Sequence, residues 1–181
     1  TLAIGTKAPD FDLPGVDGKR YTLARFTGAK VLVFAFTANH CPTAQAYEER
    51  IEKLHADFEG RGVQLVLVSP NDPLALRLDE QSYSDLGDTL EDMKIRAKDR
   101  GWTFPYLYDG ETEAMSRQYG PVATPHVFVF DAERKLRFDG RALAGCGGDG
   151  KFSADHFHPL PHADQSEPLA AIGRQGARHG E

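Results

Sequence analysis

The sequence has few of the residues that mark specialised folds. It contains two cysteines, two methionines and one tryptophan among 181 residues. Two cysteines are too few for a small protein that disulfide bonds hold together, so each of them is inert, paired once or present for its reactivity. The longest apolar runs, residues 31–36 and 127–130, have the length of strands and fall short of the roughly 20 residues that a membrane helix needs. We therefore expect no membrane insertion.

Basic charge is also scarce. The chain has 21 Lys and Arg residues against 27 Asp and Glu residues, a formal net charge of −6, and no basic stretch stands out. An excess of acidic residues argues against nucleic acid as a partner. No basic segment followed by an apolar run opens the chain, so we expect no targeting segment in it, and the composition does not indicate a compartment.

The first part of the chain predicts an α/β domain. An Asp17-Gly18 turn between two short apolar segments indicates a β-hairpin. Residues 30–36 and 63–69 are rich in β-branched and aromatic side chains, which is typical of strands buried on both faces of a sheet. The segment between these strands has helical spacing. Together they predict a β-α-β unit with a right-handed crossover.

The helix between the two strands is predicted to begin near Pro42 and to end near Gly60. Its apolar residues recur every three or four positions and are expected to face the core: Ala44, Tyr47, Ile51, Leu54 and Phe58. The charged residues of the same helix, Glu48 and Glu52 among them, are expected on the opposite side, toward solvent.

The rest of the chain predicts smaller elements and a tail. Residues 70–87 are expected to form a loop, and Asp88 or Thr89 is expected to cap a helix that ends near residue 100. A short strand, a short helix and a second hairpin are then predicted over residues 104–108, 111–119 and 126–138. Glycine and histidine crowd the sequence beyond this point, so we predict a folded domain over residues 1–140 and a tail over 141–181.

Cys41 lies between a predicted strand and the first turn of the predicted helix. Free backbone N–H groups and the positive end of the helix dipole favour a thiolate at such a place, and the neighbouring His40 can add positive charge. The alternative is a small, inert core cysteine. The position at a helix N-terminus favours the reactive interpretation.

Several short motifs together resemble one family. They are residues 8–13 (APDFDL), the Asp17-Gly18 turn, the strand that leads to Cys41-Pro42, and residues 123–126 (ATPH) before another strand. They resemble thioredoxin-like redoxins of the alkyl hydroperoxide reductase and thiol-specific antioxidant branch, over about residues 4–140. The resemblance implies a thioredoxin-like α/β fold, with a central mixed sheet flanked by helices and an N-terminal hairpin. It also implies a redox cysteine at Cys41 and a cis-proline at Pro125 beside it.

The same resemblance implies partners. They are protein thiols or disulfides, or small hydroperoxides, together with an external thiol reductant, and no cofactor is expected. The candidate catalytic residues are Cys41, His40, Thr37 and Pro125, and the candidate substrate-binding residues are Asn39, Pro42 and Thr124.

Ala38 departs from both patterns of the family. In members that exchange disulfides, a Cys-x-x-Cys motif would place the attacking thiol at Ala38, so this chain cannot complete a local two-thiol cycle. In peroxiredoxins a Thr-x-x-Cys-Pro pattern would place a threonine there, and Pro125 lies about where an arginine is expected. Thr37, Asn39 or His40 could substitute, but loss of one preorganised donor typically costs about 100-fold in rate, so we expect weak peroxidase activity.

Three interpretations follow for Cys41. The first is a thiol-based oxidoreductase with weakened or lost turnover. The second is a one-cysteine peroxidase that an external thiol regenerates, and the third is a binding module without catalysis.

The tail offers two further candidates. Cys146 lies among glycines and is either a mobile resolving thiol for Cys41 or an incidental loop cysteine. His156, His158 and His162 cluster near Asp155, but their spacing is not that of a regular metal site, so we predict no metal.

Overall fold

The computed structural model describes residues 1–76, 79 and 84–141. Within them the chain begins with a hairpin of β1 (Asp12–Pro14) and β2 (Arg20–Thr22), which pair antiparallel around the predicted Asp17-Gly18 turn. A short 3-10 helix, η1 (Leu23–Phe26), follows. The predicted N-terminal hairpin is therefore confirmed.

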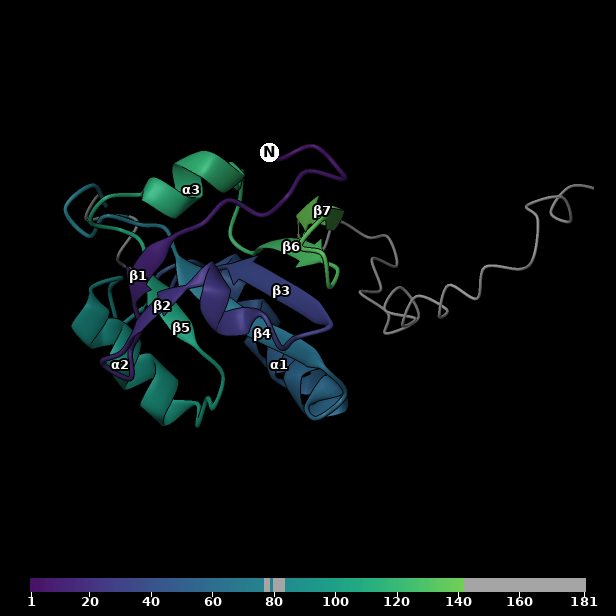
Figure 1. Cartoon of the computed structure of the whole chain (residues 1–181). Helices are drawn as coiled ribbons and strands as arrows, with labels where there is room; N and C mark the ends of the chain where they lie inside the picture. The colour runs from purple at the N-terminus through teal and green to yellow at the C-terminus, as the bar shows by residue number, and fades with distance from the viewer. Residues whose placement is uncertain (77–78, 80–83, 142–181) are drawn as a thin grey trace, which may run out of the picture. The chain divides into compact units, whose positions relative to one another are not determined.

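A five-stranded mixed sheet forms the centre of the domain (Figure 1). The strands are β3 (Val31–Phe36), β4 (Val63–Ser69), β5 (Tyr106–Tyr108), β6 (His126–Phe130) and β7 (Leu136–Arg141), in the spatial order β5-β4-β3-β6-β7. The β3, β4 and β5 strands run parallel, whereas β6 pairs antiparallel with both β3 and β7. The mixed sheet predicted from the sequence is confirmed.

Helices cover both faces of this sheet (Figure 1). On one side lie α1 (Pro42–Phe58) and α2 (Leu90–Asp99), and on the other lie α3 (Ala114–Tyr119) and the N-terminal hairpin. Alternate side chains of β3 point to opposite faces of the sheet, and Phe34 lies on the face that α3 covers. Its ring lies 5.5–6.4 Å from four other rings, those of Phe11, Phe26, Tyr119 and Phe130. This aromatic cluster anchors the hairpin and α3 to the central strand.

The helix ends agree with the sequence signals. Pro42 occupies the first turn of α1, where its missing N–H has no helical partner. Thr89 caps α2, because its hydroxyl accepts a hydrogen bond from the Asp92 N–H at 3.1 Å. None of the helices in the described part of the chain is both long and apolar enough to span a bilayer.

Two expectations need correction. Glu48 was expected to face solvent, yet it is buried, because α2 packs beside α1 and brings Arg96 and Arg100 to within 3.8 and 3.1 Å of its carboxylate. The last hairpin was expected to end at residue 138, whereas β7 continues to Arg141, because its pairing with β6 extends to the start of that strand.

The β6–β7 turn contains a buried carboxylate that fixes its shape. Asp131 accepts hydrogen bonds from the Lys135 N–H at 2.8 Å and from Arg137 Nε at 2.6 Å. Burial alone would raise the pKa of Asp131, but these hydrogen bonds outweigh it and hold the pKa below its ordinary value of 3.8. The turn lies at the end of β6 opposite His126.

Candidate functional site

Two loops meet at the same end of the sheet, one following β3 and the other leading into β6. In the β3–β6 register Phe36 is paired with His126, so residues 37–41 continue from β3 where residues 122–125 lead into β6. The sheet therefore brings the predicted reactive cysteine and the predicted proline loop together, although about eighty residues of sequence separate them.

Cys41 is the N-cap residue of α1 and is half-buried. Its Sγ atom lies 3.5 Å from the Thr124 carbonyl oxygen, to which the thiol donates. The Thr124-Pro125 peptide bond is cis, as the resemblance implied. Thr124 is half-buried, and Pro42, which follows the cysteine, is exposed.

Residues 37–39, which precede His40 and this cysteine, are buried. Ala38 is 2% exposed, so the position where a Cys-x-x-Cys motif would carry its first thiol holds an enclosed methyl group. Thr37 is also buried, and its backbone N–H donates to the Val68 carbonyl at 2.8 Å. The loop thus begins as a continuation of the sheet.

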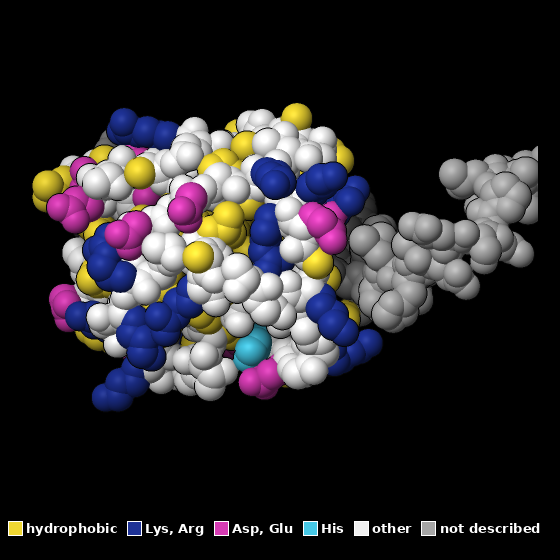
Figure 2. All heavy atoms as spheres, viewed as in Figure 1, with side chains coloured by type: hydrophobic (Ala, Val, Ile, Leu, Met, Phe, Trp, Pro, Cys, Tyr) yellow, Lys and Arg dark blue, Asp and Glu magenta, His cyan; other side chains and the backbone are white. Residues whose placement is uncertain are grey.

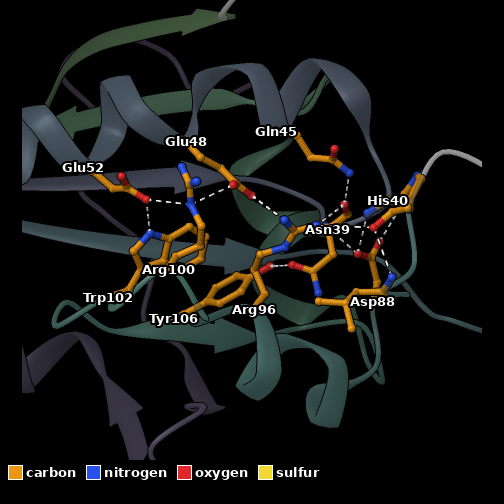
Figure 3. A network of polar contacts seen from close by, with 12 residues as sticks. Asn39, His40, Gln45, Glu48, Glu52, Asp88, Arg96, Arg100, Trp102 and Tyr106 are labelled. Carbon is orange, nitrogen blue, oxygen red and sulfur yellow. Dashed lines mark hydrogen bonds and ion pairs between the residues drawn. The ribbon is translucent and has the colours of Figure 1, made fainter. Parts of the chain in front are cut away.

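Asn39 holds the loop from inside. Its side-chain NH2 group donates to the Gly87 carbonyl at 2.8 Å. Its side-chain oxygen accepts from the Tyr106 hydroxyl at 3.1 Å (Figure 3). Its backbone carbonyl accepts from Gln45 Nε2 at 2.6 Å and from Arg96 at 3.3 Å. Asn39 therefore joins the loop to β5, α1 and α2.

Asp88 receives the next part of the loop. Its Oδ1 atom accepts from the Asn39 N–H at 2.6 Å, and its Oδ2 atom lies 2.5 Å from His40 Nδ1 (Figure 3). Asn71 Nδ2 also donates to Oδ2, at 2.6 Å. The sequence interpretation treated Asp88 only as a helix cap. The sequence did contain one hint of this role. Asp88 directly precedes the capping residue Thr89, so its carboxylate is not needed as the cap of α2 and can bind the loop before α1.

A second polar cluster joins α1 to α2 beside this site (Figure 3). Arg100 bridges Glu48 and Glu52, at 3.1 and 2.9 Å. Trp102 Nε1 donates to the same Glu52 oxygen at 2.7 Å. Burial raises the pKa of Glu48, and the nearby arginines only partly oppose that rise. Burial also raises the pKa of Tyr106, and the negative charge of Asp88 adds to this effect.

His126 fixes the second loop. This buried ring accepts the Val122 N–H on Nδ1 at 3.0 Å, and its Nε2 lies 2.5 Å from Asp139 on β7. A neutral ring with its hydrogen on Nε2 satisfies both contacts. The loop that carries Thr124 and Pro125 is therefore tied to two strands of the sheet.

Other candidates lie elsewhere. Cys146 and the histidines at 156, 158 and 162 lie outside the described residues. Within the residues that the structure does describe, no group of three or more His, Cys, Asp and Glu side chains could hold a metal ion. On the face drawn in Figure 2 the basic side chains are interspersed with acidic ones.

This combination of a mixed sheet, a helix N-terminal cysteine and a facing cis-proline defines the class of thioredoxin-like redoxins. Solved structures share the fold. A thioredoxin domain of a thiol-disulfide oxidoreductase from Bacteroides vulgatus matches with a TM-score of 0.62 at 18% identity, over 79% of this chain and 91% of that one. A hypothetical protein from Sinorhizobium meliloti 1021 matches with a TM-score of 0.71 at 34% identity, over 82% and 78% of the two chains.

The family model described as "AhpC/TSA family" matches residues 4–139, and the chain belongs to this family. A Mycobacterium tuberculosis protein with a provisional peroxiredoxin name is 33% identical over 117 residues. That match covers 64% of this chain and 62% of the relative, so the chain spans less than two thirds of its length. The resemblance inferred from the motifs is confirmed.

Proposed function

We propose that this chain is a thiol-dependent oxidoreductase that exchanges disulfides through Cys41. The observation that carries the proposal is the position of the Cys41 Sγ atom, which lies at the N-terminus of α1 and 3.5 Å from the Thr124 carbonyl. The thiolate form of a cysteine is the nucleophile in disulfide exchange, and this sulfur lies at the point where the cis-proline loop and the start of α1 meet. Cys41 is half-buried, so the residue is not enclosed in the core.

The exchange needs one thiol from this site and one from outside. The Cys41 thiolate attacks one sulfur of a substrate disulfide, which forms a mixed disulfide and releases the other sulfur as a thiolate. The buried methyl group of Ala38 cannot break that intermediate. An external thiol attacks it instead, regenerates Cys41 and leaves as a disulfide with the substrate group. Each step forms one S–S bond and breaks one, so no further oxidant is needed.

The loop opposite the sulfur supports an extended polypeptide as substrate. Ala123 and Thr124 are half-buried and adjoin the exposed Val122. A peptide that runs along this loop could pair with its backbone by strand addition and so bring its own sulfur to Cys41. Protein thiols and disulfides are therefore the proposed substrate class.

A one-cysteine peroxidase is the second candidate, and the peroxiredoxin name of the Mycobacterium tuberculosis relative favours it. Here Cys41 attacks the O–O bond, becomes a sulfenic acid and releases water or an alcohol. Two external thiols then restore it, with release of water and of their own disulfide. The site supports this chemistry less well, because the Thr37 and Asn39 side chains are buried and Ala38 supplies no donor to orient a peroxide.

Intact-mass spectrometry tests the proposal. The full chain is treated with oxidised glutathione or, separately, with peroxide, and then with a small thiol. We expect a thiol-reversible glutathione adduct on the wild type and on Cys146→Ser, in which Cys41 is the one remaining thiol. An adduct that the wild type forms and Cys146→Ser lacks contradicts the proposal. No adduct with either reagent supports a binding module, whereas rapid thiol-reversible oxidation by peroxide alone supports the peroxidase.

A further inference from the structure

His126 is a buried ring directly after the proline loop, residues 122–125, and the exchange chemistry described above does not use it. Its side chain is 2% exposed. The ring accepts the Val122 N–H on Nδ1 at 3.0 Å, and its Nε2 atom lies 2.5 Å from an Asp139 carboxylate oxygen. One ring nitrogen is therefore engaged with the loop and the other with β7.

The strand pairing holds this ring in one orientation. His126 is paired with Arg141 on β7, and Asp139 lies two residues from Arg141, on the same face of the sheet as the ring. The ring also stacks on the buried Phe128, with the two centroids 4.6 Å apart and an angle of 21° between the planes. Because the Val122 N–H donates to Nδ1, the ring hydrogen is on Nε2, where the carboxylate accepts it.

The hydrogen bond from Val122 to the ring bridges the whole proline loop. Its donor and acceptor are four residues apart, and the Thr124 carbonyl between them accepts from the Cys41 thiol. Neither the Ala123 N–H nor the Thr124 N–H donates to a group in the part of the chain that the structure describes. Val122 itself is 61% exposed. The loop therefore lies at the surface, with free backbone donors in a shape that its own bridge fixes.

We propose that His126 is a positioning residue that makes the site select polypeptide disulfides, a role that rests on the proposed function. A peptide that pairs with the loop by strand addition bonds to its free backbone groups. The bridge to Val122 fixes those groups before the peptide binds, so binding costs less conformational entropy of the loop. A disulfide without a polypeptide backbone forms no such bonds and gains nothing from the bridge.

Two substitutions separate the two ring nitrogens. In His126→Gln the amide nitrogen is an ε atom like Nε2 and can still donate to Asp139, but no acceptor remains for Val122. In His126→Asn the amide oxygen is a δ atom like Nδ1 and can still accept from Val122, while the contact with Asp139 is lost. Asp131→Asn is the matched control, because it removes a buried charge at the other end of β6 and leaves the bridge intact.

The measured quantity is the ratio of kcat/KM for two disulfides, with glutathione as the external thiol. One probe is a short uncharged peptide whose single cysteine forms a disulfide with mercaptoethanol, and the other is hydroxyethyl disulfide, which has no polypeptide. We expect His126→Gln to lower the peptide-to-hydroxyethyl ratio by about tenfold, mainly through a higher KM for the peptide, which is the effect of about one hydrogen bond. His126→Asn and Asp131→Asn should keep the ratio within about twofold of the wild type.

A ratio that His126→Gln leaves unchanged, or that His126→Asn lowers by as much, overturns the inference. A merely structural role would slow both probes alike and would not depend on one nitrogen of the ring. A wild type that exchanges with neither probe contradicts the proposed function, and the positioning role fails with it.

A second measurement needs neither activity nor a variant. Hydrogen exchange of the wild-type backbone should be at least about tenfold slower at the Val122 amide than at those of Ala123 and Thr124, although Val122 is the exposed residue. The same peptide with serine in place of its cysteine should then slow exchange at Ala123 or Thr124. Equal exchange at the three amides, or no protection by this peptide, would refute the inference whatever Cys41 does.

Discussion

The hydrogen bond between Asn39 and Tyr106 gives a quantitative test of how the site loop is held. The two side chains are buried, and the Tyr106 hydroxyl donates to Asn39 Oδ1 at 3.1 Å. A buried polar group that loses its partner costs about 1–3 kcal/mol. Tyr106→Phe leaves one such group, the Asn39 oxygen, so it should lower the free energy of unfolding by about 1–3 kcal/mol.

Asn39→Ala should cost more, because it removes two side-chain hydrogen bonds. The Gly87 carbonyl and the Tyr106 hydroxyl both lose their partner, which predicts a loss of about 2–6 kcal/mol. The double variant should lose less than the sum of the single variants, by about 1 kcal/mol, since the two changes remove one shared bond.

Urea unfolding followed by circular dichroism measures these losses, with an unchanged slope as the check that the unfolded states are comparable. Tyr108→Phe is a matched control on the same strand, because its ring is half-buried and its hydroxyl has no partner in the part of the chain that the structure describes. It should change stability by less than about 0.5 kcal/mol. Strictly additive losses in the double variant would refute the coupling.

Three further outcomes are expected. Ala38→Cys should cross-link to Cys41 under mild oxidation and gain dithiol-dependent reductase activity, measured by non-reducing mass analysis and insulin reduction; a folded variant that does neither contradicts the Cys-x-x-Cys correspondence. Asp131→Asn should lower the free energy of unfolding at pH 7 by about 1.5–3 kcal/mol. Because the pKa of Asp131 is lowered in the folded state, this contribution is present above the unfolded pKa of 3.8 and is lost as the pH falls through the folded value, so the variant and the wild type should converge in acid. Phe34→Ala should cost about 3–5 kcal/mol in urea unfolding, because a fully buried ring in contact with four others leaves a cavity; a loss below about 1 kcal/mol would contradict the packing.

Local patterns in the sequence were sufficient for most of the fold. The strand runs, the Asp17-Gly18 turn and the Thr89 cap depend on neighbours within a few residues, and each is confirmed. Glu48 shows the limit of this reasoning. Helical periodicity places it among charged residues, but its burial depends on arginines of α2, about fifty residues away. No local pattern reports such a partner.

The candidate site was predictable in its thiol and its proline but not in its supports. Cys41 and Pro125 are marked by motifs, and the sheet brings their loops together. Asp88 and His126 support those loops through contacts that span long stretches of chain. Their side chains resemble an ordinary cap and an ordinary strand residue in the sequence, so only the folded chain reveals what they hold.

The pairing of Phe36 with His126 has a consequence for how this domain can diversify. Because the thiol loop and the proline loop both extend from strands that are joined by a continuous ladder of backbone hydrogen bonds, the spacing between Sγ and the Thr124 carbonyl depends on main-chain geometry. Main-chain geometry is insensitive to side-chain identity. Substitutions in the covering helices, or new surface segments added to the edge strands, can therefore change the surroundings of the Cys41 sulfur while its spacing from the Thr124 carbonyl is kept.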